Sequence, residues 1–148
     1  MAGNVIYRSP IKDEPETVSD KTVAGAYLPG ILVTESASAL TVATGANIED
    51  DLLVLSNRRF YGQDVATAYA SGDTGVAYRP RPGEIYQVRV AGTTYAKSDP
   101  LTVGASGYLE DAAAGERVLA FFEDTPGAYS AGDLADVRIA NSFNIAAV

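Results

Sequence analysis

The sequence contains no histidine, no cysteine and no tryptophan. Without histidine and cysteine, the Ser-His-Asp and Cys-His catalytic arrangements, the usual zinc sites and haem ligation by these residues are excluded. Disulfide bonds are excluded too, which suits synthesis in a reducing cytoplasm. No apolar run reaches membrane-spanning length, and the start lacks the apolar core of a signal peptide. These absences predict a protein that is not an enzyme, binds no cofactor or metal ion, and does not contact a membrane.

The composition favours short strands joined by tight turns. Of 148 residues, 47% are hydrophobic and 20% are charged, which is typical of one globular domain with its own core. Alanine and valine dominate the apolar set, beside nine tyrosines, 14 glycines and seven prolines. Small, β-branched and aromatic residues between many turn formers indicate β structure. We expect a mainly β fold: a small single-domain barrel or sandwich with short strands, little helix and an extended N-terminal arm.

Alternating and apolar segments mark the expected strands. The continuous apolar run at 51–55 is typical of a buried strand, and 84–90 alternates with the period of a strand. The segment 64–70 suits a short helix or irregular structure equally well. The other expected strands are 31–34, 40–43, 76–78, 101–103, 117–122 and 136–140.

Three glycines are expected to shape the central stretch of the chain, residues 83–109. Gly83 ends a stiff, proline-containing connection and begins the strand at 84–90. Gly104 and Gly107 bracket a tight reversal between two short strands, where a positive φ is needed. We predict that these glycines serve as structural turns.

Residues 1–23 differ in composition from the rest, which predicts a division into an arm (1–23) and a compact β domain (24–148). Two prolines and alternating charges in this stretch oppose both helix and central strand. Its one β-prone patch, residues 5–7, is followed by Arg8. An extended segment of this kind can add a strand to the sheet edge of a partner. The candidate capsid-binding residues are Val5, Ile6, Tyr7 and Arg8, whereas the alternative is a merely frayed terminus.

The charges are unevenly distributed along the chain. The net charge is −8, which repels phosphate backbones and makes nucleic acid an unexpected partner. Basic residues concentrate between positions 58 and 97, and acidic residues between 110 and 136. Arg79 and Arg81 lie on a proline-stiffened loop, so we predict that they pair with carboxylates of another subunit. Solvated faces without a role are the alternative.

Two catalytic alternatives are weak. Asp73-Thr74-Gly75 matches the core of an aspartic-protease site, but that chemistry needs two such carboxylates on apolar-flanked loops. Here a glycine precedes the motif, and Gly-Asp-Thr-Gly is an ordinary turn sequence. A glycosidase needs only two carboxylates, yet it also needs a cleft and aromatic sugar platforms, and this chain has no tryptophan. Neither motif overrides the expectation that the protein is not an enzyme.

Several short, glycine-dominated motifs follow one another in order along residues 25–140. They are 29–33, 53–55, 69–74, 81–86, 101–109, 118–124 and 137–139. This order resembles the capsid decoration, or structural cement, proteins of tailed bacteriophages.

The resemblance implies a β-rich structural protein on the outer surface of an icosahedral head, where it bridges major capsid protein subunits and stabilises the shell. It also implies a homo-oligomer, with a trimer favoured over a dimer, and an N-terminal arm that pairs with a capsid strand. Two alternatives remain open. One is another phage structural component, such as a tail, baseplate or head-completion protein, and the other is a carbohydrate-binding β domain.

Overall fold

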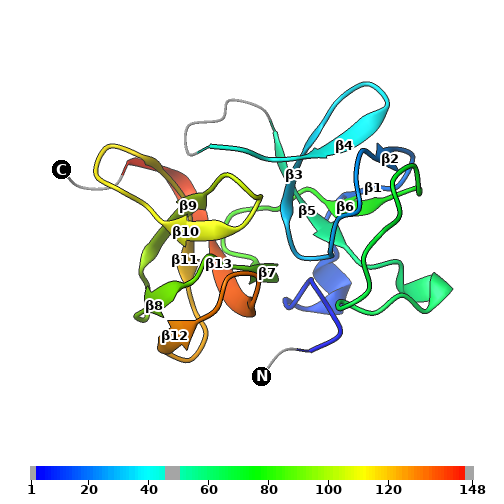
Figure 1. The fold of residues 1–148 in the computed structure, drawn as a ribbon. Coiled ribbons are helices and arrows are strands. Elements are labelled where there is room, and N and C mark those ends of the chain that lie inside the picture. Colours follow the sequence, from blue (N-terminus) through cyan, green and yellow to red (C-terminus); the bar gives the residue numbers. More distant parts are fainter. Residues whose placement is uncertain (1–2, 46–50, 146–148) are drawn as a thin grey trace.

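The computed structural model describes residues 3–45 and 51–145, which form two main β-sheets lying side by side (Figure 1). The first has the strand order β1-β6-β5-β3-β4-β2 and the second β10-β9-β11-β13-β7, while β12 and β8 form a separate two-stranded ribbon. The strands of the first sheet are β1 (Thr17–Val18), β2 (Thr22–Val23), β3 (Leu32–Glu35), β4 (Ala39–Val42), β5 (Leu52–Ser56) and β6 (Val76–Tyr78). The others are β7 (Ile85–Arg89), β8 (Thr93–Tyr95), β9 (Pro100–Val103), β10 (Leu109–Asp111), β11 (Arg117–Phe122), β12 (Gly127–Tyr129) and β13 (Leu134–Ile145).

The prediction of a mainly β, single-domain protein with little helix is confirmed. The helical elements in the described part of the chain are two single turns of 3-10 helix, η1 (Ile11–Asp13) and η2 (Arg59–Tyr61). Strand β2 pairs with β4 in parallel, and the other named strand pairs are antiparallel. The segment 64–70 forms turns, because the Asp64 carboxylate accepts hydrogen bonds from the Ala66 amide and the Thr67 hydroxyl.

Strand β5 separates two hydrophobic cores, which explains its continuous apolar sequence. Leu52 and Val54 face the core that β5 shares with the second sheet. Leu53 and Leu55 point the opposite way, into a second core that also contains Tyr69. Successive side chains of a strand point to opposite faces, so a strand covered on both faces must be apolar throughout. The buried strand predicted for 51–55 is therefore confirmed for 52–55, whereas Asp51 is exposed and precedes the strand.

The long strand β13 lies between β11 and β7 in the second sheet. Its first half pairs with β7, from Leu134 opposite Arg89 to Arg138 opposite Ile85. The strand also pairs with β11, and the register shifts between Val118 and Ala120. A bulge of this kind bends a strand and increases its twist. The predicted strand at 136–140 is correct but too short, because the extension to Ile145 depends on this pairing rather than on local alternation.

The first 23 residues are not a separate arm. Thr17 and Val18 pair with β6, and Thr22 and Val23 pair with β4, so both edges of the first sheet come from this region. The predicted division at residue 23 differs from the structure for a physical reason. Strands of two residues carry too little periodic signal to be recognised in the sequence, and their pairing partners lie far along the chain.

The turn between β9 and β10 depends on Gly107. Its φ is +72°, and an added Cβ would lie 2.8 Å from the carbonyl oxygen of Leu32, so a side chain would meet immovable backbone. The Leu32 amide also donates to the Gly107 carbonyl at 2.8 Å. Gly104 lies in the same turn without a positive φ, where its lack of a side chain leaves room for Glu110. Gly83, which lies two residues before the start of β7, has a positive φ of +83°.

Arg89 at the end of β7 ties four segments together. Its side chain is buried, with 8% of its surface exposed, and it makes no ion pair with a carboxylate in the described structure. Instead, Nε donates to Pro29 O at 2.8 Å, Nη1 donates to Gly132 O at 2.7 Å, and Nη2 donates to Val65 O. Burial lowers the pKa of Arg89. These bonds hold the loops before β3, after η2 and before β13 against one strand.

We expect Arg89→Met to lower the free energy of unfolding by about 3 kcal/mol or more, because a buried carbonyl that loses its donor costs roughly 1–3 kcal/mol. Urea unfolding followed by circular dichroism measures this change. Arg81→Met is the matched control, since the Arg81 side chain is 54% exposed and should change the midpoint little. Equal stability of the Arg89→Met variant and the unchanged protein would show that the three carbonyl contacts are dispensable.

Candidate interaction surfaces

The N-terminal segment, residues 3–9, lies along the free edge of β7. Tyr7 forms an antiparallel bridge with Tyr86, the Gln87 amide donates to Ile6 O at 2.7 Å, and the Arg8 amide donates to Ile85 O at 2.9 Å. The Gln87 side chain also binds this segment, because it accepts a hydrogen bond from the Gly3 amide and donates one to the Gly3 carbonyl. The segment therefore covers the β7 edge of this chain's own second sheet through one isolated bridge and backbone hydrogen bonds.

The structure places the predicted capsid-binding residues differently from the expectation. Ile6 is 0% exposed and Tyr7 is 7% exposed, and both belong to the core between the two sheets. Val5 is half-buried and the Arg8 residue is exposed, with Arg8 Nε 3.3 Å from Asp136 Oδ1. The strand-forming tendency of residues 5–7 was predicted correctly, but the sheet edge with which they pair is that of β7 in the same chain. Ile6 and Tyr7 are thus not presented to a partner.

Tyr7 belongs to a group of three tyrosines that closes the core beneath the N-terminal segment. Its ring centroid lies 5.5 Å from that of Tyr86 and 6.0 Å from that of Tyr78, in tilted arrangements favourable for aromatic pairs. The Tyr86 hydroxyl donates to Glu84 at 3.0 Å. Burial, and then the Glu84 carboxylate, raise the pKa values of Tyr7 and Tyr86. Both tyrosines stay neutral at physiological pH, so the group is structural.

The two arginines predicted to contact another subunit are engaged within the chain. Arg79 lies 3.0 Å from Glu35 and Asp51 and 3.4 Å from Glu16, so three carboxylates surround it. These carboxylates raise the pKa of Arg79, the hydrogen bond to Glu35 contributing most. Arg81 pairs with Glu84 at 3.1 Å and also donates to Asp13 O. Their role between subunits stays a prediction, but each already has a partner in its own chain.

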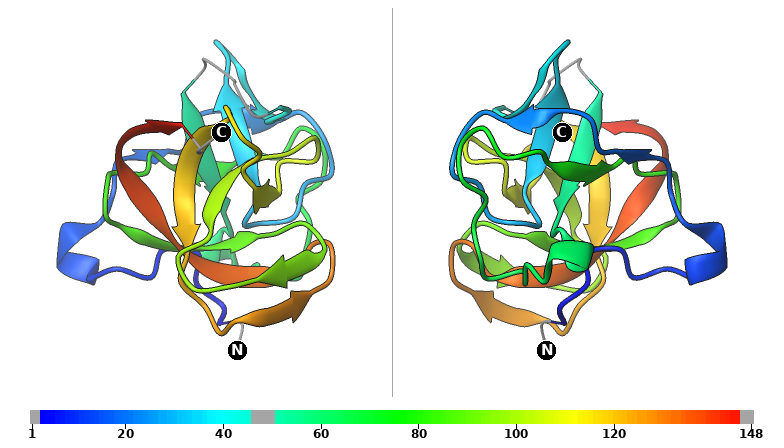
Figure 2. Two further views of the ribbon diagram at one scale, coloured as in Figure 1. Left: turned by 90° about the vertical axis from the view of Figure 1, so that its left-hand side faces the viewer. Right: turned by 90° about the vertical axis from the view of Figure 1, so that its right-hand side faces the viewer.

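The two 3-10 helices present a face that sequence reasoning did not single out, here called the η1–η2 face. Ile11 of η1 is 85% exposed, and Phe60 and Tyr61 of η2 are 77% and 76% exposed. Figure 2 shows η1, in blue, standing away from the body in both views. Ile11 and Arg59 both line one depression of about 620 Å³, so the two helices border the same hollow.

A second hollow lies between the two sheets. This groove of about 420 Å³ is lined from the first sheet by Leu52 and Val54 and from the second by Val118 and Ile139. Arg79 and Asp51, which form an ion pair, lie on its border. Its floor consists of side chains that already belong to the core, so the groove continues the packing between the sheets.

The described part of the chain contains neither a metal-ligand cluster nor a helix that could span a membrane. Within 3–45 and 51–145, no group of three or more carboxylates is arranged to hold a metal ion. The same residues contain no helix long and apolar enough to cross a bilayer. Asp73, in the turn considered as a protease motif, instead pairs with Arg58 at 2.9 Å and accepts from the Ala70 amide.

The sequence matches no protein-family model and no curated protein. Its fold is similar to a solved structure, the crystal structure of the N base of the head fiber gp8.5 in bacteriophage phi29. The two chains share 19% sequence identity with a TM-score of 0.59, over 88% of this chain and 100% of the other. At this identity the similarity shows a shared fold.

We expect Ile6→Ala to lower the free energy of unfolding by about 2–4 kcal/mol, because removing a fully buried aliphatic side chain leaves a cavity in the core. Chemical denaturation of the purified protein measures the loss. Ile11→Ala provides a control of the same residue type five positions away, and it should change stability by less than about 0.5 kcal/mol because Ile11 is exposed. If both variants proved equally stable, the N-terminal segment would be a free arm after all.

Proposed function

We propose that this chain is a structural component of the head of a tailed bacteriophage, seated on the outer surface of the capsid. There it bridges subunits of the major capsid protein and stabilises the shell. The observation that carries the proposal is the shared fold with the N base of a phage head fiber, which extends over 88% of this chain. The order of motifs along residues 25–140 supports the same assignment, because it resembles that of capsid decoration proteins.

The residue chemistry supports a binding role without catalysis. The chain lacks histidine and cysteine, and many of its described carboxylates accept hydrogen bonds from backbone amides or pair with arginine and lysine. The most exposed large apolar side chains lie on the η1–η2 face rather than in a cleft. Exposed apolar side chains that gather on one face are typical of protein–protein contact sites. The proposed partners are therefore the major capsid protein and further copies of this chain.

A role in bridging capsid subunits suits a small domain whose loops and sheets are bonded together. Each copy needs to supply only modest contacts, since many copies bound to a repetitive shell act together. The net charge of −8 keeps the unbound protein soluble and away from DNA. Arg89 and the docked N-terminal segment join the loops and both sheets into one body. A force applied at the contact with one capsid subunit is therefore transmitted to the contact with the next.

A second candidate is the attachment base of a head fiber. The matched structure is described as a base, and this chain covers all of it. A base and a cement protein both bind the shell, but a base also carries a projecting fiber. Electron micrographs of the particles distinguish them, because a base predicts thin projections and a cement protein predicts low knobs.

The purified protein should pellet with expanded, undecorated heads of the phage that encodes it, and the binding should saturate at hundreds of copies per head, because a repetitive shell offers many equivalent sites. Co-sedimentation followed by quantitative gel analysis gives the stoichiometry. Heads that already carry their full complement serve as the control and should take up no further protein. Absence of pelleting at micromolar protein, with the fold intact, would contradict capsid attachment and favour a tail or baseplate component.

A further inference from the structure

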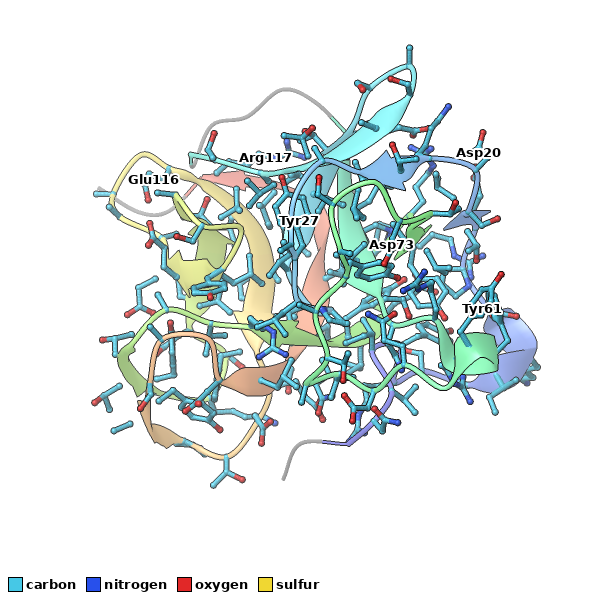
Figure 3. All side chains as sticks on the ribbon, turned by 45° about the vertical axis from the view of Figure 1, so that its right-hand side comes forward. Asp20, Tyr27, Tyr61, Asp73, Glu116 and Arg117 are labelled. Carbon is cyan, nitrogen blue, oxygen red and sulfur yellow. The ribbon has the colours of Figure 1, made fainter. Side chains whose placement is uncertain are left out.

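The η1–η2 face combines the most exposed large hydrophobic residues of the described chain. Ile11, Phe60 and Tyr61 are each more than three-quarters exposed. The rings of Phe60 and Tyr61 pack against each other with centroids 5.0 Å apart. In Figure 3, Tyr61 lies on one side of the molecule, and Glu116 and Arg117 lie on the opposite side. Leaving these three side chains in water is costly, so their concentration on one face requires a reason.

The same face carries a hollow beside these projecting side chains. The depression of about 620 Å³ is lined by apolar and aromatic residues, Val5, Tyr7, Ile11, Tyr78 and Ile85, and by the polar residues Arg8, Ser9, Glu14, Arg59 and Asp136. Pockets of roughly 300–1,000 Å³ bury groups of the size of a small molecule, so this hollow has room for an aromatic side chain. Projection and hollow thus lie next to each other, bordered by the same two helices.

Charges of both signs on this face lack a salt bridge in the described structure. Lys12 of η1 and Arg59 of η2 make no ion pair, and neither do Asp13 and Glu14. Most other basic side chains of the described residues lie within 4 Å of a carboxylate. Two free cations and two free carboxylates within one face can pair across an interface if the partner presents the same face.

We propose that the η1–η2 face binds the η1–η2 face of a second copy of this chain, with the aromatic pair of one copy entering the depression of the other. An isologous interface, in which two identical subunits meet through the same face, requires a self-complementary surface. This face meets that requirement in shape, because it has a projection and a hollow, and in charge, because it has unpaired groups of both signs. Binding of an unrelated partner would require only one of these features, whereas this face combines exposed apolar side chains with unpaired charges of both signs.

Both projections are held in place before contact. The Tyr7 hydroxyl bonds to Pro10 O at 3.2 Å and to Asp13 O at 3.1 Å, which fixes the two ends of η1. The Arg58 guanidinium lies 5.5 Å from the centre of the Tyr61 ring and is itself bound to Asp73. Ordering loops and side chains on association costs free energy, so surfaces that are already ordered bind more tightly. The arrangement favours association rather than a merely solvated loop.

Sedimentation velocity across about 1–100 µM tests the proposal, because a complex whose Kd lies in or below this range is populated at these concentrations. We expect the unchanged protein to form a two-fold symmetric dimer. Phe60→Ser combined with Tyr61→Ser should weaken association at least about 100-fold, as loss of central aromatic anchors does. Ile11→Asp should act likewise, and neither change should alter the thermal unfolding of the monomer, because the side chains are exposed.

Ser38→Asp is the matched control for Ile11→Asp, because it adds the same charge at the exposed tip between β3 and β4. It should leave association unchanged. Equal association of the aromatic double variant and the unchanged protein would overturn the proposal, as would a protein that remains monomeric up to about 100 µM. Head binding is measured separately on the same variants. If the protein is monomeric and the aromatic double variant no longer binds heads, the η1–η2 face contacts the shell instead. If no variant and not even the unchanged protein binds heads, the proposed function fails, but the self-association result remains valid.

Discussion

The buried guanidinium of Arg89 is the constraint on which the arrangement of the two sheets depends. Its side chain replaces water at three carbonyls from loops that no strand pairing connects. Its backbone amide also donates to Gly30 O at 2.8 Å, and the Gly30 amide donates in turn to Leu55 O at 2.7 Å. A strand of the second sheet is thereby bonded through one residue to the central strand of the first. An uncharged side chain could fill the space but could not satisfy these acceptors.

The docked N-terminal segment has the same effect at the other end of β7. By covering the free edge of this strand, it removes an exposed template for strand addition, which in an abundant assembly protein would promote aggregation. It also supplies Tyr7, whose hydroxyl holds η1 in its projecting position. Burial of the segment is therefore linked to presentation of Ile11. The residues predicted to bind the capsid thus support the proposed contact surface from within instead of forming it.

The sequence was informative wherever the signal was local. The double burial of β5 follows from its unbroken apolar run, and the reversal at Gly107 follows from its glycines. Long-range pairing was hidden: residues 5–8 show strand tendency, but nothing nearby indicates that β7 is their partner. Alternation in 84–90 marks Gln87 and Arg89 as polar-face residues, and only loops distant in the sequence bury them. A single 3-10 turn has no period to detect, so the η1–η2 face could not be predicted.

A cryo-electron microscopy reconstruction of the virion tests the central claim most directly, that this chain is a structural protein of the head exterior. The account predicts density for the two-sheet domain on the outside of the shell, in symmetric clusters whose members meet through η1 and η2. Within each copy, residues 5–8 should lie on its own β7. Density for the domain only in the tail or baseplate, or its absence from the particle, would contradict the account.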